Sequence, residues 1–367
     1  MKKILFICGS IEPGHDGVGD YTRELAGALI KKEIECKIVA IMDRVAKGCE
    51  LEDQKTNGSV ISVLRISENL SYNERKKKLK GLVSEFAPNW VSLQYVPFAF
   101  SPQGTPLSLI RLLPQSNSFK WHFMIHEAYV WSNLTFKRNI LRHIEIQILK
   151  RLVKTLKPDV IHTSNKLYQK LLKQVSVDSE ILELFGNIPI SKRNDLIPKA
   201  EQLQGVFFGS GPLEENFSRF LDGLKSYTAL RNQPFKIVFC GRPDFRTRQF
   251  VRYLEKNLKG LGIMIEERGE LSASELSMLF RKSHFGISRE PPEAMGKSGA
   301  AITMLEHGIP LWVPLSEDKE HLISGFDFRI DQCFLRLEEI GDKELKEGYI
   351  LFRQLNDTSM KMLKSLE

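Results

Sequence analysis

The sequence predicts an α/β protein made of two Rossmann-like, doubly wound domains that face one another across a cleft. Two observations carry this expectation. Short apolar runs alternate with amphipathic helical runs along most of the chain, and the alternation lapses once near the middle. Strands that alternate with helices form parallel sheets with helices on both faces. With 367 residues and 42% hydrophobic content, the chain is long enough for two such domains.

The N-terminal half predicts a single parallel sheet. Apolar runs of strand length lie at residues 3–9 (KILFICG), 36–42 (CKIVAIM) and 60–66 (VISVLRI). A helix is expected between the first two runs, from about Tyr21 to Lys32. Farther along, two amphipathic helices end just before Pro88 and Pro158, and a polar residue then leads into an apolar strand. We therefore assign residues 1–190 to an N-terminal domain.

A polar, proline-bearing stretch then interrupts the pattern, and we interpret residues 191–204 as a linker. Strand-like runs return as GVFFGS, FKIVFCGRP, GIMIEERGE and HFGIS. Within this region Ser272 and Glu275 have the spacing of a capping box at a helix start. These elements predict a C-terminal domain at residues 205–342, and residues 343–367 predict a charged terminal helix.

The bulk composition limits the classes of partner. The chain has 53 basic and 45 acidic residues, a net charge of +8 that is spread along its length. Such an excess suits phosphorylated ligands or an anionic membrane surface, and no nucleic-acid motif accompanies it. The five cysteines lack CxxC spacing, and no run approaches the length of a membrane span. We expect a cytoplasmic protein without a nucleic-acid partner.

A candidate phosphate site lies within REPPEAMGKSGAAITMLEHGIPLWV, at residues 289–313. Ser298 is placed to cap a helix, Gly299 permits close approach to the backbone, and Lys297 adds a positive charge. The first turn of that helix carries no acid, and amide N–H groups at such a helix start attract phosphate. The alternative is an ordinary capped helix with a solvated lysine. A position at the carboxyl end of a sheet favours the phosphate hypothesis.

Further polar residues are expected at the carboxyl ends of strands. His126 ends the run KWHFMIH, where a histidine can hydrogen-bond a sugar hydroxyl. Glu290 and Glu293 precede the predicted phosphate turn and would accept hydrogen bonds from sugar hydroxyls or stabilise positive charge at an anomeric carbon. Arg242 follows a strand and Arg289 borders the candidate phosphate site, so either would reach a diphosphate. A structural histidine, solvated acids and a surface arginine are the alternatives.

The loop after the first strand is rich in glycine, with Gly14, Gly17 and Gly19. A nicotinamide-binding GxGxxG motif is excluded, because Thr22 occupies the place of its third glycine. Asp43 follows the second strand, where a ribose-binding acid would stand in a dinucleotide enzyme, but acids at strand ends are common.

Five further histidines are interpreted as structural: His122, His143, His162, His284 and His307. The sequence lacks HExxH, DxD and clustered cysteines, so no metal cofactor is expected. It also lacks the GxSxG and P-loop motifs. The chemistry is therefore expected to come from positioning and electrostatics.

Over nearly its whole length the chain resembles the GT-B glycosyltransferases, specifically the retaining family 4 group. The resemblance rests on the order and spacing of GHDGVGDYTRELAGALIKKEIECKIVAI, SLQYVPFAFSPQG, MIHE, VIHTSN and FGISREPPEAMGKSGAAITMLEHGIPLWV. It implies that the N-terminal domain holds the acceptor, that the C-terminal domain holds a nucleoside diphosphate sugar, and that no metal is needed. It further implies that His126 lies near the donor sugar and that Gly17 and Gly19 lie beside the diphosphate.

Two departures from the family pattern stand out. The family usually carries two glutamates seven residues apart, and the place of the second holds Thr303, while Glu306 lies closer to Gly308. The family's usual arginine and lysine after the first strand of the second domain are missing from GVFFGSGPLEENFSRF. We expect Lys297 and Ser298, together with the helix N-terminus, to replace that positive charge.

The expected activity is transfer of a sugar from a nucleoside diphosphate sugar to a hydroxyl of a glycan or lipid-linked acceptor. Retention at the anomeric carbon follows from the resemblance alone. The alternatives are an epimerase or hydrolase of the same architecture and a non-catalytic partner that binds sugar nucleotides. Two basic amphipathic segments, residues 71–86 and 136–157, leave peripheral contact with a membrane open.

Overall fold

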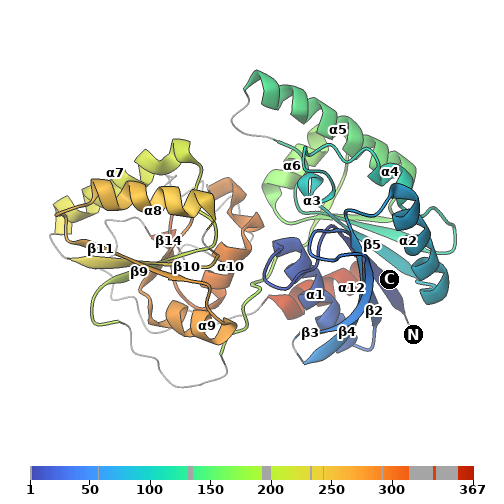
Figure 1. Cartoon of the computed structure of the whole chain (residues 1–367), viewed down its shortest axis with the longest axis horizontal. Coiled ribbons are helices and arrows are strands. Elements are labelled where there is room, and N and C mark those ends of the chain that lie inside the picture. Colours follow the sequence, from blue (N-terminus) through green and yellow to red (C-terminus); the bar gives the residue numbers. More distant parts are fainter. Residues whose placement is uncertain are drawn as a thin grey trace. The chain divides into compact units, whose positions relative to one another are not determined.

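The computed structural model describes residues 2–56, 58–130, 135–191, 200–231, 234–242, 244–290, 292–313, 334–335 and 354–367, without the side chains at 230–231, 292–293 and 334–335. The chain divides into two compact units (Figure 1). The first unit is Met1–Glu183 together with Leu355–Glu367, and the second is Leu184–Gln354. Each unit has its own sheet and its own apolar core.

The first unit is built on an eight-stranded sheet in the order β3-β4-β2-β1-β5-β6-β7-β8. Its strands are β1 (Lys3–Cys8), β2 (Glu35–Asp43), β3 (Cys49–Thr56), β4 (Ser59–Ser67), β5 (Trp90–Tyr95), β6 (Lys120–Ile125), β7 (Val160–Thr163) and β8 (Glu180–Ile181). Neighbouring strands are parallel, except that β3 and β4 pair antiparallel at one edge. The sequence analysis missed β3 because this edge strand, CELEDQKT, lacks an apolar run.

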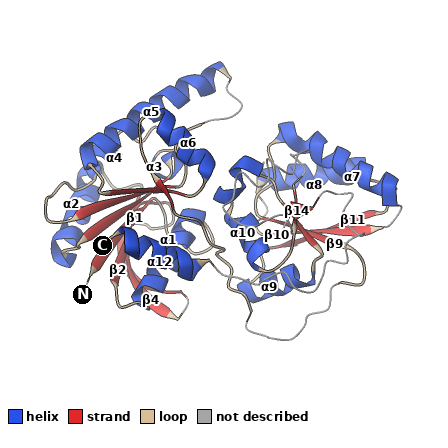
Figure 2. Cartoon of the chain, turned by 180° about the vertical axis from the view of Figure 1, so that it is seen from behind, coloured by secondary structure: helices blue, strands red, loops and turns tan. Residues whose placement is uncertain are grey.

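Helices cover both faces of this sheet. They are α1 (Gly17–Ile30), α2 (Tyr72–Phe86), α3 (Pro97–Phe100), α4 (Leu109–Leu112), α5 (Phe136–Leu156), α6 (Lys166–Gln174) and α12 (Leu355–Ser365). Side chains of α2, α5 and α6 share a core with alternate residues of β1, β2, β5 and β6. On the other face α1 packs against the strands, and Figure 2 shows α12 beside it. The doubly wound arrangement predicted from the sequence is confirmed.

The two predicted helix ends before proline are also confirmed. Ala87 and Lys157, the residues before Pro88 and Pro158, end α2 and α5 with left-handed backbones (φ 47° and 46°). Each donates its backbone N–H to a carbonyl of the last helical turn. The chain therefore turns sharply into β5 and β7, which follow directly.

The second unit has a six-stranded, wholly parallel sheet in the order β11-β10-β9-β12-β13-β14. Its strands are β9 (Gln204–Phe208), β10 (Phe235–Cys240), β11 (Ile263–Gly269), β12 (Phe285–Ile287), β13 (Leu311–Trp312) and β14 (Phe334–Leu335). Its described helices are α7 (Phe217–Arg231), α8 (Phe245–Asn257), α9 (Ala273–Lys282) and α10 (Gly299–Glu306), with short 3-10 segments η1 (Glu214–Asn216) and η2 (Pro292–Lys297).

In this unit α7 and α8 bury an aromatic-rich core against one face of the sheet. On the opposite face Phe280 of α9 contacts Phe208, and Met304 of α10 lies against Gly286 of β12. The predicted capping box is present at the start of α9, where Ser272 and Glu275 bond each other's backbone amides. The expected order of strands and helices therefore holds in the second unit as well.

The chain termini meet in the first unit. The sequence analysis placed a terminal helix at residues 343–367 without assigning it to either domain, and α12 supplies its described part. Lys2 Nζ donates to Leu366 O at 2.8 Å, and Thr358 Oγ1 donates to Glu183 O at 2.9 Å. The C-terminal segment thus completes the N-terminal unit. Residues 343–353, and 192–199 of the expected linker, lie outside the described part of the chain.

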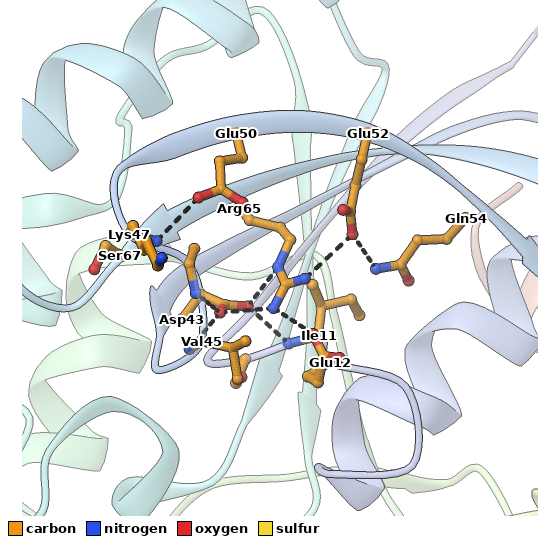
Figure 3. Close-up of polar contacts among 12 residues, drawn as sticks. Ile11, Glu12, Asp43, Val45, Lys47, Glu50, Glu52, Gln54, Arg65 and Ser67 are labelled. Carbon is orange, nitrogen blue, oxygen red and sulfur yellow. Dashed lines mark hydrogen bonds and ion pairs between the residues drawn. The ribbon is translucent and has the colours of Figure 1, made fainter.

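A buried ion-pair network holds the loop after β1 (Figure 3). The guanidinium of Arg65 on β4 makes a two-pronged contact with Asp43 at the end of β2, at 3.2 and 3.0 Å. Arg65 Nη2 also lies 2.6 Å from Glu12 Oε2 in the loop, and Arg65 Nη1 lies 3.4 Å from Glu52 on β3. Arg65 therefore ties three strands to the segment that leads into α1.

Asp43 is fully buried and its acceptor sites are used by the protein itself. Its carboxylate accepts backbone N–H groups from Ile11, Val45 and Ala46 in addition to Arg65. Burial on its own raises the pKa of Asp43, but the bonds from Arg65 and from those amides outweigh it, so the pKa lies below its usual value. Asp43 therefore has a structural role and does not present a carboxylate to a ribose.

Replacing Arg65 should destabilise the first unit strongly. Arg65→Met leaves the buried carboxylate of Asp43 without its counter-ion, which we expect to lower the free energy of unfolding by about 3–5 kcal/mol. The matched control is Arg44→Met, because Arg44 is exposed and pairs with Glu68 at 3.9 Å; its effect should stay below about 1 kcal/mol. Urea unfolding followed by tryptophan fluorescence reports on this sheet through Trp90 and Trp121.

Adding Asp43→Asn to Arg65→Met removes the orphaned charge and should recover part of the loss. If Arg65→Met and Arg44→Met lowered the free energy of unfolding equally, the Arg65 network would not be what holds the loop after β1 in place.

Candidate functional site

The glycine-rich loop and the start of α1 form a candidate ligand-binding region in the first unit. Gly14 has a φ of +73°, which favours glycine, and its N–H donates to Asp20 Oδ1 at 3.0 Å. A side chain at Gly19 would lie 2.7 Å from Ser10 O, so this glycine lets the loop pack on the helix. A Cβ added at Gly17 would meet nothing within 4 Å in the described part of the chain, so there is space beside this glycine.

The charges at this helix start are negative. Asp16 is the N-cap of α1 and accepts the Gly19 N–H at 2.7 Å, while Asp20 lies in the first turn and also bonds Arg23. Burial raises the pKa of both carboxyls, against the lowering effect of these backbone hydrogen bonds. The amides of Gly14 and Gly19 are thus already bonded to carboxylates. The roles of Gly17 and Gly19 beside a diphosphate remain predictions, and this geometry favours sugar hydroxyls over phosphate.

His126 lies directly after β6, as the sequence predicted, and its ring is almost wholly buried. Its backbone N–H donates to Tyr95 O at 3.0 Å, and Tyr21 of α1 packs edge-on against its ring at 4.9 Å. Burial lowers the pKa of His126 to about 3. The ring is therefore neutral near pH 7, which favours a positioning role over proton transfer.

A chain of buried polar side chains runs from His126 across three strands. His126 Nε2 bonds Gln94 Oε1 at 2.9 Å, and Gln94 Nε2 donates to Ser92 Oγ at 2.7 Å. Ser92 Oγ in turn bonds His122 Nδ1 at 2.7 Å, and His122 Nε2 bonds His162 Nδ1 at 3.0 Å. We call Gln94, Ser92, His122 and His162 the histidine array.

In the second unit the structure brings Glu290 and Lys297 together. Glu290 Oε2 lies 3.8 Å from Lys297 Nζ, and Glu290 Oε1 lies 3.2 Å from Arg289 Nε. Arg289 also donates from Nη1 to Ser210 O at 3.2 Å, in the loop after β9. One carboxylate thus stands between two cations where the loops after β9 and β12 meet, which leaves this cluster with a net positive charge.

The helix start next to this cluster carries the predicted cap. Ser298 Oγ accepts the N–H of Ala301 at 3.2 Å, and the first turn of α10 holds no acidic residue. Among the described residues, Asn187 Nδ2, at 3.8 Å, is the only neighbour within 4 Å of a Cβ added at Gly299. The start of α10 is therefore open to a ligand at Gly299 and electrostatically suited to an anion, unlike the acidic start of α1.

The remaining predicted residues lie apart from this cluster or outside the description. Arg242 follows β10 and pairs with Glu270 at 2.7 Å near the solvent. The side chain of Glu293 lies outside the described residues. Thr303, in the place of the family's second glutamate, accepts the N–H of Asn187 at 3.2 Å, and the buried Glu306 accepts that of Gln354 at 3.0 Å. Both of these bonds are internal to the second unit.

Sequence reasoning missed the histidine array and the contact of Arg289 with Ser210. A signal for the array was present in the sequence, because SLQ, WHF and IHT place polar residues inside runs that otherwise read as fully buried strands. Arg289 was expected beside the phosphate site, but no local pattern indicated its contact with Ser210, because that partner is a backbone carbonyl far away in the sequence.

The comparisons with known proteins identify the fold. No family model and no curated protein matches the sequence. Among solved structures, sucrose-phosphate synthase from Thermosynechococcus elongatus is 12% identical, with 85% of this chain and 81% of that chain covered and a TM-score of 0.59. HepE from Anabaena, in complex with UDP and glucose, is 10% identical, with 100% and 99% covered and a TM-score of 0.60.

UDP-GlcNAc 2-epimerase from Methanocaldococcus jannaschii is also similar, at 11% identity, with 100% of this chain and 99% of that chain covered and a TM-score of 0.53. At these identities the likeness establishes the fold alone. The chain has the GT-B fold, with two α/β units that each carry a mainly or wholly parallel sheet.

Because three histidines are buried in the neutral state, we expect the free energy of unfolding of the first unit to fall in mild acid. Burial lowers the pKa of His122 well below its usual value, that of His126 to about 3 and that of His162 to about 4. Unfolded histidines take up protons near pH 6.5, so stability falls as pH drops below 6.5, by about 1.4 kcal/mol per pH unit for each ring. Burial raises the pKa of Glu145 to about 7, so this carboxyl takes up a proton in the folded chain. That uptake stabilises the folded chain as pH falls, and it cancels the loss of stability caused by about one histidine ring.

Urea unfolding at pH 7.5, 6.5 and 5.5 measures this slope. Glu145→Gln removes the offset and should steepen the loss below pH 6.5 by about 1.4 kcal/mol per pH unit. A stability that does not change between pH 6.5 and 5.5 would contradict the neutral, buried state of these rings.

Proposed function

We propose that this protein is a glycosyltransferase that moves a sugar from a nucleoside diphosphate sugar to a hydroxyl of a glycan or lipid-linked acceptor. The observation that carries the proposal is the cluster of Arg289, Glu290 and Lys297 beside the acid-free start of α10, at the carboxyl edge of a parallel sheet. Ligands of open α/β sheets bind at that edge. The GT-B fold supports the same function.

The leaving group explains the need for positive charge. When the bond between the anomeric carbon and the diphosphate breaks, negative charge grows on the diphosphate oxygens. Lys297, Arg289 and the amides at the start of α10 are placed to stabilise that charge within the second unit. We propose that these groups supply the stabilisation without a metal ion, and that the sugar is transferred with retention.

Glu290 and His126 are proposed to position the sugar. Glu290 holds both cations in the ligand-free protein, and with donor bound it would accept hydrogen bonds from sugar hydroxyls or stabilise positive charge at the anomeric carbon. His126 is neutral and would serve through hydrogen bonding. The first unit would hold the acceptor, because the acids at the start of α1 suit hydroxyl groups.

An epimerase that acts on a nucleotide sugar is the second candidate. It is supported by the likeness to the archaeal UDP-GlcNAc 2-epimerase structure, which extends over the whole of this chain. The cluster of Arg289, Glu290 and Lys297 would serve this reaction too, since an epimerase must also bind the diphosphate of its nucleotide sugar. The two candidates differ in their need for an acceptor.

Nucleotide binding should depend on Lys297. We expect one of UDP, GDP, ADP and CMP to stabilise the protein against heat, with UDP tested first because HepE was solved with it. Lys297→Ala should weaken that binding about tenfold to a hundredfold, the usual worth of a hydrogen bond to a charged group. Lys256→Ala, at an exposed lysine of α8, is the matched control and should leave the affinity unchanged.

Stabilisation by NAD and by none of these nucleotides would contradict the proposal, as would equal affinity of wild type and Lys297→Ala. With the donor base known, incubation with nucleotide sugar and no acceptor separates the candidates: a new sugar epimer indicates the epimerase, and product formed only with acceptor indicates the transferase. NMR of the new glycosidic bond then reports retention or inversion.

Peripheral membrane contact is a further part of the proposal, and helix α5 supports it. Phe136, Ile140 and Ile144 recur at helical spacing and are 82%, 48% and 40% exposed. The helix carries one acid, the buried Glu145, and six basic residues: Lys137, Arg138, Arg142, Lys150, Arg151 and Lys154. Exposed apolar side chains among basic ones suit the surface of an anionic bilayer. No helix in the described part of the chain is long and apolar enough to span a membrane.

Removing the apolar stripe should release the protein from anionic vesicles. We expect the wild type to float with liposomes that contain anionic lipid, and the triple variant Phe136→Ser, Ile140→Ser, Ile144→Ser to remain largely in the soluble fraction. Phe245→Ser is the control, because Phe245 is 74% exposed on α8 in the other unit and should not affect flotation. Absence of wild-type flotation would rule out this membrane contact.

A further inference from the structure

The histidine array lies in an unusual place for polar side chains. Ser92 and Gln94 share one face of β5, His122 is on β6, and His162 is on β7, next to each other in a sheet whose other face is packed with apolar residues. All four are fully buried. Buried polar groups must be paired, and these form an unbroken chain that begins at His126, the residue proposed to position the sugar.

The direction of the hydrogen bonds follows from what each atom can do. The amide nitrogen of Gln94 can only donate, and it faces Ser92 Oγ. Gln94 Oε1 can only accept, so His126 Nε2, at 2.9 Å, must carry the proton. A reversed Gln94 amide would reverse every bond, and the far end of the chain is needed to choose between the two directions.

Glu180 on β8, at the far end of the chain of hydrogen bonds, distinguishes between the two directions. Within the described residues, the buried His162 Nε2 makes no hydrogen bond, and the carboxylate of Glu180 lies 3.9 Å from it, which would be an ion pair if the ring were charged. Burial keeps the His162 ring neutral near pH 7, with Lys361 of α12 contributing in the same direction. With a proton on Nε2 the neutral ring has a donor 3.9 Å from the carboxylate; in the reversed chain, two acceptors would stand at that distance.

We propose that Glu180 and the histidine array are positioning residues that hold His126 as the neutral Nε2–H tautomer, with its lone pair on Nδ1. Every donor then points away from His126: to Gln94, Ser92, His122, His162 and finally Glu180. His126 can therefore accept a hydrogen bond from a ligand hydroxyl and has no second ring proton to donate. The importance of this state for catalysis rests on the proposed function, whereas the tautomer is a property of the free protein.

The tautomers can be measured directly in the ligand-free, full-length protein with 15N-labelled histidine rings. Long-range 1H–15N spectra near pH 7.5 distinguish protonated from unprotonated ring nitrogens. We expect His122, His126 and His162 each to carry the proton on Nε2. A proton on Nδ1 of His126, or a mixture of its two tautomers, would overturn the proposal whatever the enzyme does.

The surface variant Glu180→Lys tests the direction without disturbing the core, because the Glu180 side chain is 77% exposed. A lysine offers donors where the array needs an acceptor, so we expect the Nδ1–H tautomer to gain population at His162 and His122. Asp178→Lys makes the same change of charge at an exposed residue two positions away and should leave the spectra unchanged. Identical spectra for wild type and Glu180→Lys would show that Glu180 does not set the direction of the hydrogen bonds in the histidine array.

The core variant Gln94→Leu tests the link to His126. It should release His126 into a mixture of tautomers and lower kcat about tenfold to a hundredfold, as is usual when the partner that orients a site residue is lost. A wild-type His126 spectrum in Gln94→Leu would overturn the link. If the tautomers are as expected and no nucleotide sugar is turned over, the proposed function fails and the positioning array stands.

Discussion

The structure of the first unit depends on one constraint: both faces of its sheet are covered, so any polar group inside must find a partner in the protein. Helices α1 and α12 close one face and α2, α5 and α6 the other. Parallel sheets of this kind normally contain branched apolar residues. Where this chain departs from that rule, buried polar groups bond one another: Arg65 pairs with Asp43 toward one edge of the sheet, and the residues of the histidine array pair with each other toward the other edge.

The two polar networks have different consequences. The Arg65 network is ionic, uses the Asp43 carboxylate several times, and fastens the loop after β1 to β2 and β4. The histidine array is neutral, and burial keeps it so, because a charged imidazole inside the sheet would lose its hydration. One network thus sets the position of a backbone segment, and the other sets the protonation of a side chain.

The two candidate helix starts, one in each unit, differ in charge, and this difference supports the proposed division of roles. At α1 the carboxylates of Asp16 and Asp20 occupy amides that a phosphate would need. At α10 a neutral serine caps the helix, and Lys297 and Arg289 lie next to Glu290 close by. The charge around a helix start can therefore favour hydroxyl groups in one unit and a diphosphate in the other.

The sequence by itself determined the alternation of strands and helices, the helix ends before Pro88 and Pro158, and the caps at Ser272 and Ser298, because each depends on residues a few positions apart. It also placed His126 at a strand end and Lys297 at a helix start. Only the tertiary structure decided which partners these residues have. The pairing of Asp43 with Arg65, the row of polar groups behind His126 and the packing of α12 in the first unit all join residues distant in sequence. Strand order and register bring such residues together, and no local pattern encodes them.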